Sequence, residues 1–334
     1  MHNPSRSSFI AGAIALAAGL GFSSVVMADT WRMSHKQTPE SIEGQLFQFF
    51  ADEVAARTDG ALNVEVYPSE QLGADDAVLE QMQLGTIHLY PEGISYLQKW
   101  VPEMRFTSAP FLFDDRDHWS RFMQSDLVNG WLDRVEAEAG IIVLGDPTAF
   151  VRGPYRVMVT SRPFETIDEM QGIRLRMHPD ELAGESWRHL GAEVRTLAWT
   201  ETYESIGRGI VEAVNSPIAL VESMRFYEVA PNILRHGEYE QGVAFMMSAV
   251  AWERLDEETQ AHVLDAYNAA ALQSSMQTGS VAEESIERMK QRGVTYSELD
   301  TAPFVARMAE MYQAMDQRGE LPPGFLDAVQ ATRD

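Results

Sequence analysis

The chain has 334 residues, of which 26 are Lys or Arg and 50 are Asp or Glu, so its formal net charge is −24. This excess of negative charge disfavours binding to nucleic acids and to anionic lipid surfaces, because both select for Lys and Arg. The chain contains no Cys, which excludes disulfide scaffolds, thiolate metal sites and cysteine nucleophiles. Its length exceeds that of one ordinary domain and favours two lobes.

The first 28 residues have the pattern of a secretory signal. Arg6 lies in a short polar start, residues 9–22 form an uncharged apolar run, and small residues precede Ala28. This run is too short, and too rich in Gly and Ala, for a membrane-spanning helix, which needs about 20 apolar residues. We therefore expect cleavage after Ala28 and export of a mature protein that has no direct membrane anchor.

Strand and helix patterns alternate along the rest of the chain. Apolar residues at helical spacing predict a helix that begins near Ile42 and is closed by Gly60. Residues 62–67 alternate between apolar and polar, which is typical of a strand. The further predicted strands are residues 30–33, 87–90, 141–144, 155–160, 173–177 and 192–197, and the further predicted helices are residues 75–84, 180–190 and 200–207.

The order of these elements predicts an α/β fold with two lobes and largely parallel sheets. The region from Asp256 to Arg292 is almost free of Pro and Gly, which predicts a helix long enough to run along both lobes. No flexible linker separates the lobes, so we expect several chain crossings that form a hinge. We expect lobe I to contain residues 29–152 and about 241–270, and lobe II to contain residues 153–240 and about 271–334.

Sequence motifs for common enzyme chemistry are absent. The chain has no phosphate-binding loop, no dinucleotide-binding glycine motif, no zinc-protease motif and no serine-hydrolase motif, and no two His are four residues apart. The adjacent Asp75 and Asp76 are acceptable as an acid/base pair or as part of a Ca²⁺ site, but they also suit the start of a helix. We expect no cofactor, no metal and no catalysis; an exported enzyme that acts on a small acid is the alternative.

Arginines stand on strands where a fully covered sheet would carry apolar residues. In the strand 173–177, the period of two places Arg174 and Arg176 on one face, and Arg156 raises the same question on the preceding strand. These guanidinium groups therefore either reach solvent at an edge or point into a cleft between the lobes. In a cleft they would clamp a carboxylate, because the planar guanidinium group matches its two oxygens.

Six groups of residues give the chain a family resemblance when they are taken in order. They are residues 66–73 (VYPSEQLG), 101–103 with 109–113 (VPE and APFLF), 170–176 (MQGIRLR), 190–192 (LGA), 198–203 (AWTETY) and 225–229 (RFYEV). Through them, residues 30–315 resemble the DctP-type solute-binding subunit of TRAP (tripartite ATP-independent periplasmic) transporters. The resemblance implies a periplasmic binding protein with two hinged lobes, each a sheet flanked by helices, and a long helix that spans both. It also implies that the partners are a small organic acid and the small and large membrane subunits of the transporter.

The same resemblance assigns ligand-binding residues. Arg176 occupies the position of the arginine that pairs with the ligand carboxylate, and Arg156 matches a second arginine. Trp199 matches an aromatic residue that packs on the ligand. Asp75 and Glu92 match positions that contact polar parts of some ligands.

Three further residues complete the predicted site. Tyr90 ends a strand close to Glu92 and is expected to line the pocket. The family often has Asn directly before a Pro, whereas here Ser216 precedes Pro217 and Asn215 stands one place earlier. We expect the carboxylates of the site to accept hydrogen bonds from hydroxyl or amine groups and to repel a second carboxylate. The expected ligand is therefore a hydroxylated acid such as a sugar acid, with an aromatic acid or a sulfonate as the alternative.

Overall fold

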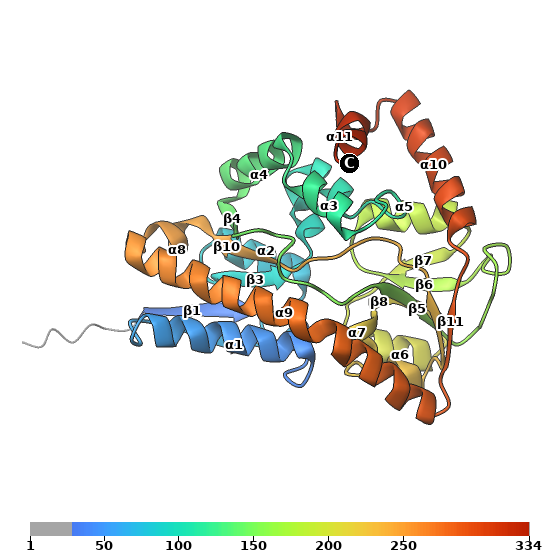
Figure 1. Cartoon of the computed structure of the whole chain (residues 1–334), viewed down its shortest axis with the longest axis horizontal. Helices are drawn as coiled ribbons and strands as arrows, with labels where there is room; N and C mark the ends of the chain where they lie inside the picture. Colours follow the sequence, from blue (N-terminus) through green and yellow to red (C-terminus); the bar gives the residue numbers. More distant parts are fainter. Residues whose placement is uncertain (1–28, 334) are drawn as a thin grey trace, which may run out of the picture.

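The computed structural model describes residues 29–333, which form two sheets covered by helices (Figure 1). The first lobe is built on a sheet of order β2-β1-β3-β10-β4, and the second lobe on a sheet of order β11-β9-β5-β8-β6-β7. This arrangement confirms the predicted two-lobed α/β architecture. The predicted signal segment, residues 1–28, lies outside the described residues.

The strands and helices have the following bounds. The strands are β1 (Asp29–Ser34), β2 (Leu62–Tyr67), β3 (Leu89–Glu92), β4 (Ile141–Leu144), β5 (Arg156–Thr160), β6 (Arg174–Met177), β7 (Glu193–Thr196), β8 (Ala213–Pro217), β9 (Asn232–Arg235), β10 (Ala244–Ser248) and β11 (Thr295–Glu298). The α-helices are α1 (Ile42–Arg57), α2 (Asp75–Gln83), α3 (Arg116–Met123), α4 (Asp126–Ala139), α5 (Glu181–His189), α6 (Thr202–Gly207), α7 (Ile218–Val221), α8 (Ala249–Glu253), α9 (Glu257–Gln291), α10 (Ala302–Gln317) and α11 (Phe325–Ala331). Three short 3₁₀ helices are η1 (Ile94–Lys99), η2 (Pro102–Ser108) and η3 (Phe226–Glu228).

Both sheets are largely parallel, as predicted, but each contains one strand that runs against its neighbours. β1 runs parallel to β2 and β3, and β6 runs parallel to β7 and β8. By contrast, β10 is antiparallel to β3 and β4, and β5 is antiparallel to β8 and β9. β5 and β10 are the first strands that the chain forms after it crosses from one lobe to the other. β5 and β10 therefore begin at the end of the sheet that faces the crossing, whereas the other strands of each sheet end on that side.

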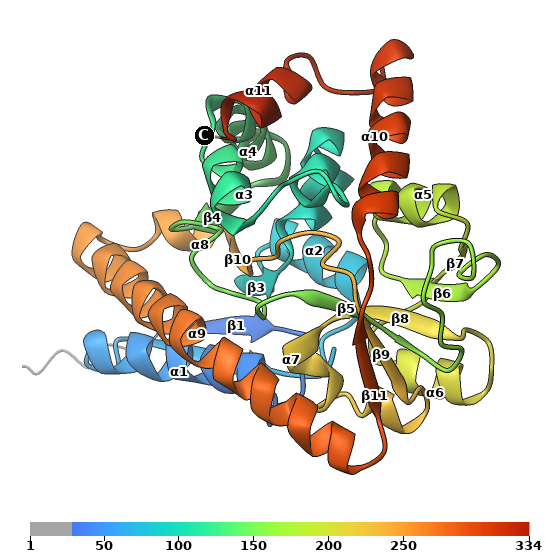
Figure 2. The same cartoon turned by 45° about the vertical axis from the view of Figure 1, so that its right-hand side comes forward.

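The long helix α9 runs along both lobes, as predicted. It spans Glu257–Gln291 without a break and packs against α1 of the first lobe and α7 of the second. Figure 2 shows the same course from a second direction. Asp256 caps its start, because the Asp256 side chain accepts a hydrogen bond from the backbone N–H of Thr259 at 2.8 Å.

The C-terminal helices connect back to the first lobe. α10 packs on α5 of the second lobe, whereas the Phe325 ring of α11 packs on Phe106 of η2 with 4.9 Å between ring centroids and on Phe122 of α3 with 5.7 Å. His118 Nε2 donates a hydrogen bond to the Val329 carbonyl at 2.8 Å. The chain therefore touches the first lobe again after β11, in a region that we expected to belong to lobe II. The exact lobe boundaries stay a prediction.

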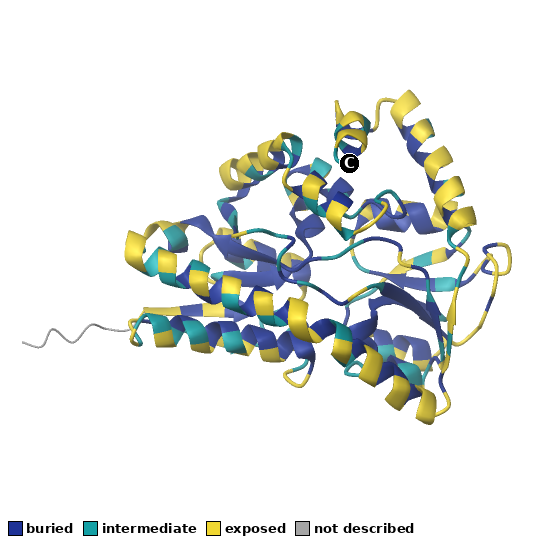
Figure 3. Cartoon of the chain, in the orientation of Figure 1, coloured by how far each residue is buried: buried dark blue, intermediate teal, exposed yellow. Residues whose placement is uncertain are grey.

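Burial follows the two layers of each lobe. The strands of both sheet centres are buried, and the helices expose only their outer faces (Figure 3). The apolar core also continues between the lobes, because Phe111 packs on Trp187 and on Phe304. Tyr312 donates a hydrogen bond to the Pro110 carbonyl at 2.8 Å. Within residues 29–333, every helix is too short or too polar to cross a membrane.

Gly145, which follows β4 at the first crossing, tests this packing. Its φ is +59°, and an added Cβ would lie 2.6 Å from the ring of Tyr267. We expect Gly145→Ala to lower the free energy of unfolding by about 1–3 kcal/mol, because the backbone and the ring both resist the methyl group. Gly130→Ala in α4, where nothing lies within 4 Å, is the matched control and should raise the same free energy by about 0.5–1 kcal/mol. Urea denaturation measures both, and equal effects of the two substitutions would contradict this account.

Candidate functional site

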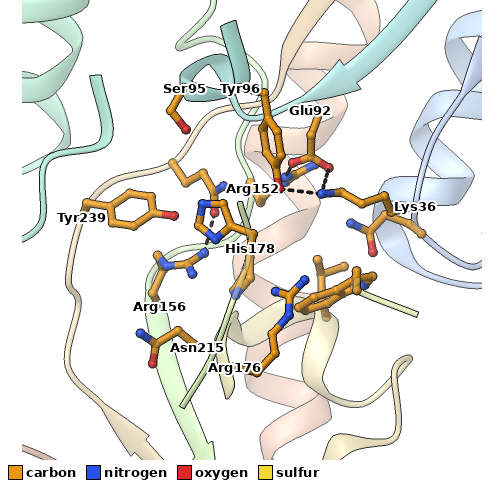
Figure 4. Close-up of a pocket in the computed structure, with 15 residues that line it drawn as sticks. Lys36, Glu92, Ser95, Tyr96, Arg152, Arg156, Arg176, His178, Asn215 and Tyr239 are labelled. Atoms are coloured by element: carbon orange, nitrogen blue, oxygen red, sulfur yellow. Dashed lines mark hydrogen bonds and ion pairs between the residues drawn. The ribbon is translucent and has the colours of Figure 1, made fainter. Parts of the chain in front are cut away.

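A cavity between the two lobes is lined mainly by charged and polar side chains (Figure 4). The space in it that atoms do not fill, counted together with the solvent at its mouth, is about 440 Å³. In the first lobe the lining residues come from the segment after β1, from β3 and from η1. In the second lobe they come from β5, β6, β8, α7 and the segments after β6 and β7, and the crossing segments supply the rest. They are Lys36, Gln37, Glu92, Ser95, Tyr96, Arg152, Arg156, Arg176, His178, Trp199, Asn215, Pro217, Leu220, Tyr239 and Gln241.

The mixed sheet of the second lobe explains why two arginines meet at this cavity. Arg156 is the first residue of β5, and Arg176 lies one residue before the end of β6. Because β5 runs antiparallel to β8 while β6 runs parallel to it, the start of β5 and the end of β6 lie at the same end of the sheet. This is the end formed by the carboxyl ends of the parallel strands, where open α/β sheets bind ligands.

Arg176 is buried and forms no ion pair with a carboxylate of residues 29–333. Its Nε donates a hydrogen bond to the Leu197 carbonyl at 2.9 Å, and its guanidinium lies 5.3 Å from the ring centroid of Trp199. Its Nη2 has no hydrogen-bond partner among residues 29–333, and no carboxylate of these residues forms an ion pair with it. Burial lowers the pKa of Arg176 below its usual value, although an arginine stays protonated. A buried, unpaired cation is costly, so this position suits an anion.

Arg156 differs from Arg176 because a buried carboxylate already pairs with it. Its Nε donates to Glu238 Oε1 at 2.8 Å, and its Nη1 donates to Gln241 Oε1 at 2.7 Å. Burial alone would lower the pKa of Arg156, but Tyr239 and Glu238 outweigh burial and raise it. Arg156 therefore lines the cavity as a paired cation.

Glu238 also fixes Asn215. Asn215 Nδ2 donates to Glu238 Oε2 at 2.7 Å, and His236 Nε2 donates to Asn215 Oδ1 at 3.2 Å. The neighbouring Ser216 points to the other face of β8, as alternation along a strand requires; its hydroxyl donates to the Pro217 carbonyl at 2.9 Å, and the residue is fully buried. Of the predicted pair, the structure thus places Asn215 in the cavity lining and Ser216 outside it.

The first lobe contributes a buried cluster of alternating charges. Lys36 Nζ lies 2.9 Å from Asp75 Oδ1 and 3.3 Å from Glu92 Oε2, and it donates to the Tyr96 hydroxyl at 2.7 Å. Arg152 forms ion pairs with Glu92 and with Glu43. Burial would raise the pKa of Glu92, but Arg152 and Lys36 outweigh it and lower this pKa to about 2. Glu92 is therefore an ionised carboxylate whose oxygens face cations.

Asp75 and Tyr90 lie near the cavity but do not line it. Asp75 is the first residue of α2, and Asp75 Oδ1 contacts both Lys36 and the Tyr90 hydroxyl, which donates to it. Both residues were predicted to contact the ligand. In the structure they contact Lys36 or one another instead, and Lys36 faces the cavity in their place.

The residues of the site carry no sign of a metal centre. Among residues 29–333, no group of three or more His, Asp or Glu side chains is arranged to hold a metal ion. The cavity lining contains four cations, Lys36 and three arginines, against one carboxylate. Such a lining favours an anionic organic ligand.

The family model for DctP, the bacterial extracellular solute-binding proteins of family 7, matches residues 33–318. The chain belongs to this family.

A solute-binding protein of Roseobacter denitrificans is 27% identical to it over 261 residues, which cover 77% of this chain and 78% of the relative. The crystal structure of a TRAP periplasmic solute-binding protein from Roseobacter denitrificans, with bound L-galactonate, is 22% identical, has a TM-score of 0.81, and covers 91% of this chain and 98% of its own. The crystal structure of a TRAP periplasmic solute-binding protein from Ochrobacterium anthropi, with bound L-fuconate, has a TM-score of 0.84 at 22% identity and covers 92% of this chain and 100% of its own. The resemblance found in the sequence is confirmed.

Sequence reasoning placed Arg156, Arg176, Trp199, Glu92 and Asn215 in the site of this DctP-family protein, and the structure brings all five to the cavity lining. It missed the other lining residues. Three of them carried a usable signal, because Lys36, Gln37 and His178 lie within three residues after a strand end, as Glu92 does in the predicted elements. The remainder come from η1, from the crossings, from the end of β8 and from α7, and no local pattern distinguishes them. The missed residues are Lys36, Gln37, Ser95, Tyr96, Arg152, His178, Pro217, Leu220, Tyr239 and Gln241.

The buried histidines make the stability of this DctP-family protein depend on pH. Burial lowers the pKa of both His35 and His236 from 6.5 to about 4. Between these values the unfolded chain binds protons that the folded chain does not, so the free energy of unfolding falls as the pH falls from 6.5 towards 4. We expect a loss of roughly 3 kcal/mol per histidine across this interval.

Replacing one of these histidines isolates its contribution. His236→Gln should flatten the decline of the free energy of unfolding between pH 6.5 and 4, whereas His262→Gln, on the partly exposed side of α9, should leave it unchanged. Urea denaturation at a series of pH values measures both. The same decline in the two variants would show that His236 does not titrate in this way.

Proposed function

We propose that this DctP-family protein captures a small organic acid in the cavity between its lobes and delivers it to the membrane subunits of a TRAP transporter. The observation that carries the proposal is the buried guanidinium of Arg176, which has no counter-ion among residues 29–333. A ligand carboxylate would supply that counter-ion and form charge-assisted hydrogen bonds with it. The other lining cations already have carboxylate partners, so the cavity suits one carboxylate rather than two.

The remaining lining favours a hydroxylated acid. Side chains that bind hydroxyl groups well, such as Ser95, Tyr239 and Gln241, surround the cavity. The ring of Trp199 already packs on Arg176 and on Phe226, so less of it is free to stack on an aromatic ligand. The structural relatives that hold L-fuconate and L-galactonate support the same choice. An aromatic acid or a sulfonate is the alternative ligand for the same role.

Closure of the lobes would complete binding. Contacts already cross between the lobes: Arg105 Nη1 lies 3.0 Å from Glu181 Oε2, and the ring of Tyr96 packs on His178 with 5.6 Å between centroids. In an open form the cavity would hold water, and closing it would strengthen the bonds to Arg176 by lowering the local dielectric. The ligand must prefer the closed form, or it would not drive closure. The proposal includes cleavage after Ala28, a periplasmic location, and binding without catalysis.

Substitution of Arg176 tests the proposed clamp. Arg176→Gln should lower the affinity for the bound acid at least tenfold, because removing one partner of a buried charge pair costs about 2–5 kcal/mol. Arg174→Gln is the matched control on the same strand, since Arg174 is partly exposed and faces Glu212 with 3.5 Å between Nη2 and Oε1. Isothermal titration calorimetry measures both affinities. An Arg176→Gln variant that binds as well as the Arg174→Gln variant would remove Arg176 from the site.

A ligand screen tests the function itself. We expect the melting temperature of the purified protein to rise with one or more hydroxylated monocarboxylic acids, and to rise less with dicarboxylic acids, because binding to the folded state stabilises it. The screen should contain sugar acids, keto acids, sulfonates, aromatic acids and dicarboxylic acids. Chromatography of the incubated acids should show no product. Stabilisation by none of these acids would contradict the proposal, and a reaction product would favour an enzyme.

A further inference from the structure

Besides Arg176, the lining residues Gln37, Trp199 and Arg152 have buried polar atoms without a hydrogen-bond partner among residues 29–333, and of these three only Arg152 already forms ion pairs, with Glu43 and Glu92. Gln37 and Trp199 are 3% and 7% exposed, and neither Gln37 Oε1 nor Trp199 Nε1 has a hydrogen-bond partner among residues 29–333. Buried polar groups in native proteins are nearly always paired, so each exception requires an explanation. Because both residues line the same cavity, a bound ligand is the simplest partner for both atoms.

A strained turn holds the backbone of Gln37. The Gln37 carbonyl accepts a hydrogen bond from the backbone N–H of Ser69 at 3.1 Å, and Glu70 N–H donates to the His35 carbonyl at 3.0 Å. Ser69 and Glu70 both have left-handed backbones, with φ of 54° and 58°. Strain of this kind persists where the surrounding structure requires it, and it is common at ligand clamps. The turn therefore holds the backbone of Gln37 in place beside the cavity.

Trp199 is held by packing. Its ring meets Phe226 edge-to-face with 5.0 Å between centroids, and the Arg176 guanidinium lies over it. The indole N–H consequently keeps one direction when the ligand changes. A fixed donor of this kind supplies specificity rather than simple apolar contact.

The two unpaired atoms demand different chemistry from a ligand. Gln37 Oε1 is an acceptor and needs a donor, whereas Trp199 Nε1 is a donor and needs an acceptor. An ionised carboxylate provides acceptors only, so a simple carboxylic or dicarboxylic acid leaves Gln37 Oε1 unpaired. A hydroxyl group provides both a donor and an acceptor.

We propose that Gln37 and Trp199 determine specificity by forming hydrogen bonds to the hydroxylated part of the ligand, while Arg176 holds its carboxylate. Gln37 accepts a hydrogen bond from a ligand hydroxyl group, and Trp199 donates one to a ligand oxygen. This inference rests on the proposed function and extends it. Gln37 belongs to the first lobe and the other two residues to the second, so one hydroxylated monocarboxylate that satisfies all three connects the lobes.

The test pairs protein variants with ligand variants. The probes are L-galactonate and the set of its single-deoxy analogues, which includes L-fuconate, and calorimetry gives each affinity. Gln37→Met keeps the length of the side chain and removes the acceptor, so it should lower the affinity for L-galactonate about tenfold. The deoxy analogue that lacks the hydroxyl group bound by Gln37 should bind the unsubstituted protein about tenfold more weakly than L-galactonate. Gln37→Met should leave the affinity for that one analogue unchanged, because the hydrogen bond is already missing. An equal loss for L-galactonate and for every analogue would overturn the assignment.

Further variants separate this role from a structural one. Gln48→Met makes the same chemical change on the exposed face of α1, where the Gln48 amide donates to Asp52 Oδ1 at 2.9 Å, and it should leave all affinities unchanged. Trp199→Phe retains a ring between Phe226 and Arg176 but removes the N–H, and it should lower the affinity for L-galactonate about fivefold. Unchanged affinity in Trp199→Phe would show that the indole N–H makes no bond to the ligand.

The outcomes for the unsubstituted protein distinguish this inference from the proposed function. If the protein binds another organic acid of the screen but not L-galactonate, the assignment of Gln37 and Trp199 is wrong and the proposed function stands. If the protein binds no organic acid, both are wrong.

Discussion

Burial of positive charge between two lobes is the constraint on which the site depends. Taking a cation out of water is expensive unless a counter-ion comes with it. Lys36, Arg152 and Arg156 each meet a carboxylate of the chain itself, from α1, α2, β3 or the second crossing. Arg176 alone among the lining cations has none within residues 29–333. The charges of the three paired cations are thus already neutralised by carboxylates of the chain. A solute anion would gain the most free energy of binding at the unpaired Arg176.

Local sequence patterns were sufficient to predict most elements near the site, because a strand or helix is a short-range property. The strand that holds Arg176 and the long helix α9 follow directly from periodicity and from the absence of Pro and Gly. The direction of β5 and β10 does not, because it depends on how the chain returns from the other lobe. The predicted strand at residues 87–90 is displaced by two residues in β3, Leu89–Glu92, since Ile87 and Leu89 are both buried and suit either register.

The pairing of charges was not predictable from the same patterns. Glu238 lies in a loop 82 residues from its partner Arg156, and nothing local to either residue indicates the other. Asp75 and Glu92 were assigned to the ligand because the family resemblance matches them to positions that contact polar parts of some ligands. In the structure Lys36 forms ion pairs with both of these carboxylates, so they neutralise a cation of the chain itself. Proximity follows from the order of elements, whereas the choice of partner follows only from three-dimensional packing.

The unbroken course of α9 has a mechanical consequence. A helix of 35 residues is about 52 Å long, and α9 lies on α1 at one end and on α7 at the other. With no proline to act as a joint, separation of the halves must either curve this rod gently or peel one end from its neighbour. In the first case bending of α9 limits how far the lobes separate and stores elastic energy that favours their closure.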